Sequence, residues 1–199
     1  MSYRKEKKYQ LTRSDFVNIK KIMFDKGMQT LYPSRIINSC YFDSSELVFF
    51  HNSEEGVLPR KKIRIRWYDN INSFTKETKI SSIEGRFKYT EDVNDINSIK
   101  KLLHSSIIDK SYGKLLPKII VSYQREYFIL GKLRITFDKN ILYKNLKLFT
   151  HPSIQDTNCV MEVKTPFECG DDYIESLVPY PTSRFSKYTR GLINTDSTI

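Results

Sequence analysis

One short stretch of the chain, KKIRIRWYD, alternates apolar and charged side chains. Ile63, Ile65 and Trp67 occupy every second position, and Arg64 and Arg66 lie between them. Successive side chains of a β-strand point to opposite faces of its sheet. The pattern therefore predicts a strand with one apolar face and one positively charged face.

The same period-two alternation recurs along most of the chain. The segments involved are rich in β-branched and aromatic residues, which favour strands. About eight strands are predicted, and their sequences are SYRKEKKYQL, SRIINSCYFD with LVFFHN as its continuation, RKKIRIRWYD, FTKETKIS, GRFKYTE, KIIVSYQREYFIL, KLRITFD and CVMEVKT.

Helical spacing of apolar residues is less frequent. It predicts a helix over residues 13–27, with Ser14 as a candidate N-cap and Gly27 as a stop signal. Shorter helices are predicted over three further ranges, 95–104, 171–178 and 186–194. An antiparallel sheet with a few helices indicates an α+β fold or a closed barrel.

Length and composition limit the class of protein. The 199 residues suit a single domain, which we assign to residues 1–199. No apolar run approaches the roughly 20 residues that span a bilayer, and the N-terminus lacks the apolar core of a secretion signal. These features favour a cytoplasmic protein. The three cysteines and three histidines are scattered, which disfavours a zinc site or a thiol nucleophile.

The charge balance indicates an anionic partner. The formal net charge is +10 and the pI is near 9.4, which is typical of proteins that bind nucleic acid, phosphate esters or acidic membranes. For a single strand, a charged face is most often the solvated side of a sheet. Here several predicted strands place a carboxylate beside a cation on one face, namely Glu6 with Lys8, Glu77 with Lys79, Asp138 with Arg134 and Glu162 with Lys164.

This repeated pairing suggests a second interpretation, in which the charged faces line a polar tunnel. The planar guanidinium of arginine donates two hydrogen bonds at once to a phosphate group. Carboxylates bind hard cations such as Mg²⁺ and Mn²⁺, which often bridge protein carboxylates to substrate phosphates. The pattern is consistent with a polyanion held by basic residues and a divalent metal held by carboxylates.

The order of the motifs resembles the triphosphate tunnel metalloenzyme superfamily, and most of all the catalytic domain of the vacuolar transporter chaperone (VTC) polyphosphate polymerases and their bacterial relatives. The matching segments are EKKY, YFD, RIRWY, ETK, RFK, SYQREYF, RITFD, MEVK and RFSKYTRG, in this order over nearly the whole chain. The resemblance implies an eight-stranded antiparallel tunnel. It also implies transfer of the terminal phosphate of ATP onto a polyphosphate chain, with Mn²⁺ or Mg²⁺ as cofactor.

The resemblance also implies roles for individual residues. The catalytic cations are Arg64, Arg66, Arg125, Arg134 and Lys164. The further phosphate ligands are Lys8, Lys79, Lys88, Tyr123, Arg184, Ser186 and Lys187, with either Arg86 or Lys88 as the base of its strand. Glu162 is the principal metal ligand, and Glu6 and Glu77 match acidic positions of the wider superfamily.

Two alternative functions stay open at this point. The same tunnel would serve a triphosphatase or a nucleotidyl cyclase, and a basic protein could also bind polyphosphate or nucleic acid without catalysis. Most aromatic residues fall on the face opposite the charges, with exceptions such as Tyr68, Tyr123 and Tyr127. This arrangement disfavours base stacking and hence nucleic acid. Coupling of synthesis to transport would require a separate membrane partner.

Overall fold

The computed structural model describes residues 4–69, 73–148, 151–166 and 169–196. Its strands are β1 (Arg4–Leu11), β2 (Gln29–Asp43), β3 (Arg60–Tyr68), β4 (Phe74–Ser82), β5 (Gly85–Val93), β6 (Ile107–Asp109), β7 (Gly113–Leu130), β8 (Leu133–Asn145), β9 (Ile154–Gln155) and β10 (Cys159–Pro166). Its helices are α1 (Arg13–Asp25), α2 (Val48–Glu55), α3 (Ile99–Leu103), α4 (Asp171–Leu177) and α5 (Lys187–Thr195).

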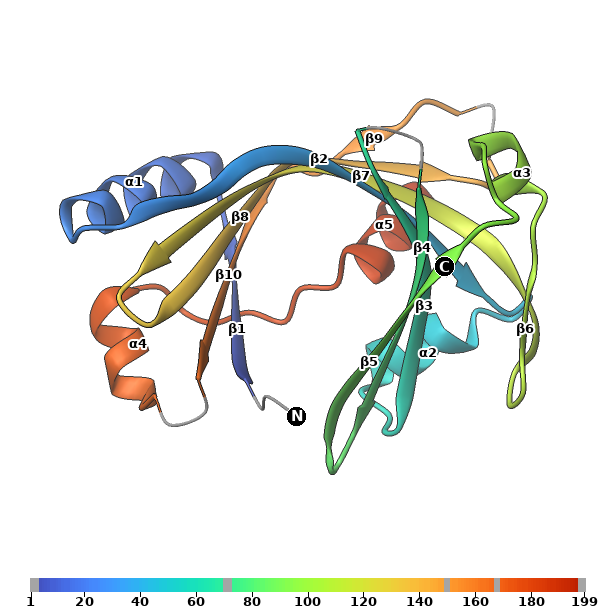
Figure 1. The fold of residues 1–199 in the computed structure, drawn as a ribbon, viewed down its shortest axis with the longest axis horizontal. Helices are drawn as coiled ribbons and strands as arrows, with labels where there is room; N and C mark the ends of the chain where they lie inside the picture. The colour runs from blue at the N-terminus through green and yellow to red at the C-terminus, as the bar shows by residue number, and fades with distance from the viewer. Residues whose placement is uncertain (1–3, 70–72, 149–150, 167–168, 197–199) are drawn as a thin grey trace. The chain divides into compact units, whose positions relative to one another are not determined.

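The strands belong to one predominantly antiparallel sheet. Its hydrogen-bonded order is β1-β10-β8-β7-β2-β3-β4-β5, with β6 paired to β7 and β9 paired to β8. Figure 1 labels these elements along the chain. An antiparallel sheet with separate helices confirms the predicted α+β class.

The described residues form two compact units. Within the described parts of the chain, unit 1 draws on the ranges 4–35, 123–141 and 155–185, and unit 2 on the ranges 36–122, 142–154 and 186–196. The assignment of residues 1–199 to one domain and the closure of the sheet into a tunnel stay predictions.

Unit 1 buries its core between α1 and the sheet. Phe16, Ile19 and Met23 form the buried face of α1, and the rings of Phe16 and Phe137 meet edge to face with centroids 5.3 Å apart. Apolar residues of β1, β7, β8, β10 and α4 belong to the same core. The alternation in these strands therefore separates a buried apolar face from a charged face, as the sequence predicted.

The N-cap of the first helix lies two residues before the predicted one. Thr12, rather than Ser14, caps α1: its hydroxyl accepts a hydrogen bond from the Asp15 backbone at 3.1 Å, and the Asp15 carboxylate accepts one from the Thr12 backbone at 3.3 Å. This reciprocal capping box places the helix start at Thr12, and Ser14 lies within the first turn. The predicted stop at Gly27 is consistent with its left-handed φ of 91°.

Unit 2 contains β3, β4 and β5 side by side (Figure 1). The apolar residues Ile63, Ile65 and Trp67 are buried as predicted. The prediction that LVFFHN continues the second strand is wrong, because most of this segment forms α2. The Asp43 carboxylate accepts hydrogen bonds from the backbone amides of Phe49 and Phe50 at 2.9 and 3.0 Å, and so satisfies the first turn of the helix.

The remaining helices agree with the helical spacing of the sequence. α3 is shorter than predicted and has Ser98 as its N-cap, whose hydroxyl accepts a hydrogen bond from the backbone of Lys101. α4 and α5 lie where the pattern placed them. Within the described parts of the chain, none of the helices has the length and apolar character needed to cross a bilayer.

Candidate functional site

The predicted site residues divide between the two units. The unit 1 cluster contains Glu6, Lys8, Tyr123, Arg125, Arg134, Glu162, Lys164 and Arg184. The unit 2 cluster contains Arg64, Arg66, Glu77, Lys79, Lys88, Ser186 and Lys187. The role of each residue stays a prediction, and so does their convergence in one tunnel.

Glu162 lies at the centre of the unit 1 cluster. Its antiparallel neighbours are Lys8 on β1 and Thr136 on β8, and its side chain is only 11% exposed. The Lys164 ammonium is 2.9 Å from the Glu162 carboxylate. Burial alone raises the pKa of Glu162, but the positive charges of Lys164, Lys8 and Arg125 outweigh that effect and hold its pKa below the ordinary value. Glu162 is therefore ionised at neutral pH.

Glu6 adds a second carboxylate to this cluster. Its oxygens lie 3.6 Å from the Lys8 ammonium and 3.8 Å from the Lys164 ammonium. Lys8 also donates a hydrogen bond to the backbone carbonyl of Phe185 at 3.2 Å. The cluster thus alternates carboxylates and ammonium groups across β1 and β10.

The oxygen donors near Glu162 fit a hard divalent cation. Thr136, directly opposite Glu162, has a buried hydroxyl oxygen without a hydrogen-bond partner. Within the described residues no group of three or more His, Cys, Asp or Glu side chains could hold a metal. Mg²⁺ is commonly bound by one or two carboxylates together with substrate phosphates and water. Glu162 and Glu6, with the Thr136 hydroxyl, suit that mode of binding.

Arg125 is held in place by an acidic residue outside the predicted ligand set. Its guanidinium makes two parallel hydrogen bonds to Asp138, of 2.5 and 2.7 Å, and Asp138 is 1% exposed. The same guanidinium lies over the Tyr123 ring, 5.2 Å from its centroid, and Tyr123 is buried. The sequence placed Asp138 on the charged face of its strand, but it gave no sign that Asp138 binds Arg125.

Two basic residues of the unit 1 cluster are exposed. Arg134 lies directly opposite Lys164 in the sheet. Arg184 follows Ser183, whose backbone amide donates a hydrogen bond to the carbonyl of Lys8 on β1 at 2.7 Å. Both side chains are accessible to an anion from solution.

Glu77 organises the unit 2 cluster. It is 4% exposed and accepts contacts from three basic side chains. Arg64 donates to one carboxylate oxygen at 3.0 and 2.6 Å, while Arg66 and Lys88 approach the other at 3.1 and 2.9 Å. Burial raises the pKa of Glu77, but Arg64, Arg66 and the Lys88 hydrogen bond lower it more, to about 2. The predicted metal role of Glu77 stays a prediction.

Two buried polar groups in and beside the unit 2 cluster have no hydrogen-bond partner. Arg66 Nε is buried and has no hydrogen-bond partner, and neither has the hydroxyl oxygen of Ser39, which lies directly opposite Arg66 on β2. Within RFK, Lys88 contacts Glu77, while Arg86 lies opposite Ser81 in the sheet. Which of the two is the base of this strand stays a prediction.

Tyr41 and Tyr188 connect this cluster to α5, and the predicted site did not include them. The Tyr41 hydroxyl accepts a hydrogen bond from Arg64 at 3.0 Å, and its ring stacks on that of Tyr188 with centroids 5.1 Å apart. Tyr188 in turn donates to the Asp43 carboxylate at 2.5 Å. Both tyrosines lie within motifs that carry the family resemblance, YFD and RFSKYTRG, and this position was the only sequence feature that pointed to them.

The tyrosine at position 41 has an altered acidity. Burial raises the pKa of Tyr41, but Arg64, Lys187 and Arg66 lower it more, so that its pKa lies below the ordinary value. Lys187 therefore acts electrostatically on the cluster. Ser186 is the N-cap of α5 and accepts a hydrogen bond from the backbone of Thr189.

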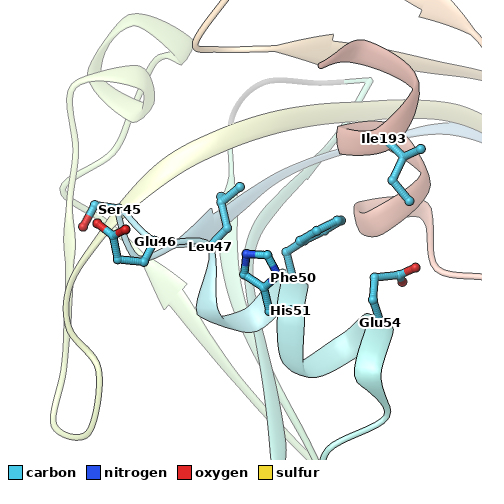
Figure 2. Close-up of a pocket in the computed structure, with 7 residues that line it drawn as sticks. All are labelled: Ser45, Glu46, Leu47, Phe50, His51, Glu54 and Ile193. Carbon is cyan, nitrogen blue, oxygen red and sulfur yellow. The ribbon is translucent and has the colours of Figure 1, made fainter. Parts of the chain in front are cut away.

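A pocket of about 660 Å³ in unit 2 contains none of these residues. Figure 2 shows its lining, with Phe50, His51 and Glu54 from α2 and Ile193 from α5. The lining also includes the acidic residue Glu46. Two carboxylates and an apolar wall disfavour a polyphosphate here.

Solved structures of similar fold come from several organisms. A candidate adenylate cyclase from Bacillus halodurans has a TM-score of 0.59 at 11% identity, and the match covers 93% of this chain and 95% of that one. A conserved hypothetical protein from Pyrococcus furiosus has a TM-score of 0.57 at 10% identity, with coverage of 94% and 99%.

A third similar structure is a candidate adenylyl cyclase from Hippeastrum, HpAC1, which has a dominant triphosphatase activity. Its TM-score is 0.56 at 14% identity, with 95% of each chain covered. At these identities the likeness concerns the fold alone. Comparison with curated proteins gives no match.

The family comparison is more specific than the structural one. The model of the VTC domain matches residues 3–194, which is nearly the whole chain. That range includes every residue of the unit 1 and unit 2 clusters. The chain therefore belongs to the VTC domain family.

Proposed function

We propose that this protein is a metal-dependent polyphosphate polymerase, which transfers the terminal phosphate of ATP onto a polyphosphate chain. The observation that carries the proposal is the surroundings of Glu162. A buried carboxylate, kept ionised by Lys164, Lys8 and Arg125, lies beside a second carboxylate and an unpartnered hydroxyl. Such a site suits a hard cation and phosphate oxygens together.

The basic residues would supply most of the catalysis. Phosphoryl transfer requires in-line positioning and neutralisation of charge on the oxygens of the transferred group. Arg125, Arg134 and Lys164 of unit 1 would bind those oxygens, and Arg64 and Arg66 of unit 2 stay predicted phosphate ligands. An oxygen of the terminal phosphate of the chain attacks the γ-phosphorus of ATP, the bond to the ADP oxygen breaks, and ADP leaves. The nucleophile belongs to the substrate, so no serine or cysteine nucleophile is needed.

The carboxylates would hold the cofactor. Glu162 and Glu6 would bind Mn²⁺ or Mg²⁺, which when bound neutralises phosphate charge and polarises the bond that breaks. Asp138 and Glu77 would act indirectly, because they hold Arg125 and Arg64 in fixed orientations.

Triphosphate hydrolysis is the second candidate function. It needs the same cations and metal, with water in the place of the terminal phosphate of the chain. HpAC1, which shares the fold, has a dominant triphosphatase activity. A binding module without catalysis is the third candidate.

The test incubates the purified protein with ATP and Mn²⁺ and separates long phosphate chains from free phosphate. Polymerase activity predicts chains in the wild type and their loss in Glu162→Gln and Arg66→Ala. Lys76→Met is the matched control, because Lys76 pairs with Glu91 at 2.6 Å outside both clusters. Phosphate release without chains would favour the triphosphatase, and binding without turnover would favour the module.

A further inference from the structure

The sheet of unit 2 contains a row of three lysines. In the antiparallel register, Lys62 on β3 lies opposite Lys79 on β4, and Lys79 lies opposite Lys88 on β5. Side chains paired in this way share one face, with Cβ atoms about 4.5–5.5 Å apart. Like charges directly opposite each other repel, so an anion bound across the row would relieve this repulsion.

The whole sheet face that carries this row has an excess of positive charge. Its register rows contain seven basic residues and two carboxylates: Arg60, Lys62, Arg64, Arg66, Lys79, Arg86 and Lys88 against Glu77 and Asp92. On the opposite face, Lys61 pairs with Asp109 at 2.7 Å and Lys76 with Glu91 at 2.6 Å. The excess charge is therefore a property of one face only.

Both ends of the lysine row are anchored. Lys62 donates a hydrogen bond to the hydroxyl of Ser186 at 2.8 Å, and Ser186 caps α5. At the other end, Lys88 donates to the Glu77 carboxylate at 2.9 Å. These contacts fix the ammonium groups at the two ends before a ligand arrives, which lowers the entropy cost of binding.

We propose that Lys62 is a phosphate ligand in its own right, which extends the predicted ligands Lys79 and Lys88 into one phosphate subsite beside Arg64 and Arg66. The inference rests on the proposed function, since it names how the same linear polyphosphate is held. A row across three strands, about 4.7–4.9 Å apart, is longer than one phosphate group. The row and its arginine neighbours therefore match consecutive phosphates of a chain.

The test measures binding of long-chain polyphosphate to the full chain, without nucleotide, metal or turnover. Lys62→Met is expected to weaken the affinity about tenfold, because a hydrogen bond between charged groups is lost. Lys62→Arg retains the charge and is expected to restore affinity to within a few-fold. Lys76→Met removes the same charge from the opposite face of the neighbouring strand, and is expected to change the affinity less than twofold.

Three results would overturn the proposal: no polyphosphate binding by the wild type, equal affinity of Lys62→Met and the wild type, or equal losses in Lys62→Met and Lys76→Met. Melting curves of each variant check that it is folded. If the polymerase assay shows no chains while binding still depends on Lys62, the proposed function fails and the subsite stands.

Discussion

Glu77 sets the charge arrangement of the unit 2 cluster at the scale of single residues. Its carboxylate contacts Arg64, Arg66 and Lys88, and it is almost completely buried. Removing one partner of a buried ion pair leaves the remaining charges without compensation. The stability of this unit is therefore expected to depend strongly on the ionised form of Glu77.

Glu77→Gln is expected to lower the free energy of unfolding at pH 7 by about 3 kcal/mol or more, as for other broken buried pairs. Because the pKa of Glu77 falls from the ordinary 4.5 to about 2 in the folded protein, the wild type retains this contribution above pH 4.5. It loses the contribution as the pH falls towards 2.

The measurement is urea unfolding of both proteins from pH 7 to pH 3. The difference between them should be constant above pH 5 and shrink below pH 4.5. Glu91→Gln is the matched control, since Glu91 also pairs with a lysine but has a side chain 64% exposed. A difference that does not vary with pH would show that Glu77 contributes by another mechanism.

Glu162 is the residue whose removal should affect metal binding most. Glu162→Gln is expected to raise the Mn²⁺ concentration for half-saturation at least tenfold, because a charged oxygen ligand becomes a neutral one. Electron paramagnetic resonance of free Mn²⁺ measures this directly. Glu126→Gln is the control, since Glu126 is also partly buried in unit 1 but pairs with Lys20 and Lys139. Unchanged Mn²⁺ binding in Glu162→Gln would contradict the assignment.

At the scale of elements, α5 contacts the rest of unit 2 through its first and second turns. Tyr188 donates to Asp43, the carboxylate that also holds the first turn of α2. A Cβ atom on Gly191 would lie 2.6 and 2.7 Å from side-chain atoms of Ile119 and Tyr143. The helix therefore packs so closely here that only glycine fits without movement of its neighbours.

Tyr188→Phe is expected to destabilise the protein by about 1–3 kcal/mol, because the Asp43 carboxylate loses a donor in a buried place. Chemical denaturation measures the loss. Tyr89→Phe, which alters a side chain 61% exposed, should change stability by less than about 0.5 kcal/mol. Equal effects of the two substitutions would contradict the role given to the Tyr188 hydroxyl.

At the scale of the whole molecule, the net charge of +10 makes stability depend on anions. An anion that binds only the folded state stabilises it by about 2.7 kcal/mol at 100 times its dissociation constant. For a chain of this size, about 5–10 °C in melting temperature is expected when tripolyphosphate is added at that concentration.

Differential scanning calorimetry checks this expectation, with sodium chloride at the same ionic strength as the control. Salt screens the repulsion between exposed charges without occupying a site, so its effect should be smaller. Equal shifts with salt and with tripolyphosphate would indicate general screening rather than a phosphate site.

The sequence by itself determined the alternation of apolar and charged positions, and with it the strands, the α+β class and most of the charged residues on each face. Ile63 and Ile65 are buried and Arg64 and Arg66 share the opposite face because side-chain direction in a strand is set locally. Family membership also followed from the order of short motifs.

Only the tertiary structure decided which charges meet. The register between strands places Glu77 opposite Arg64 and Lys62 opposite Lys79, and a shift of one residue would have reversed every face. Likewise the hydrogen bond between Tyr188 and Asp43 joins residues 145 positions apart. Pairings between distant segments depend on sheet register and helix docking, which local alternation of residues does not encode.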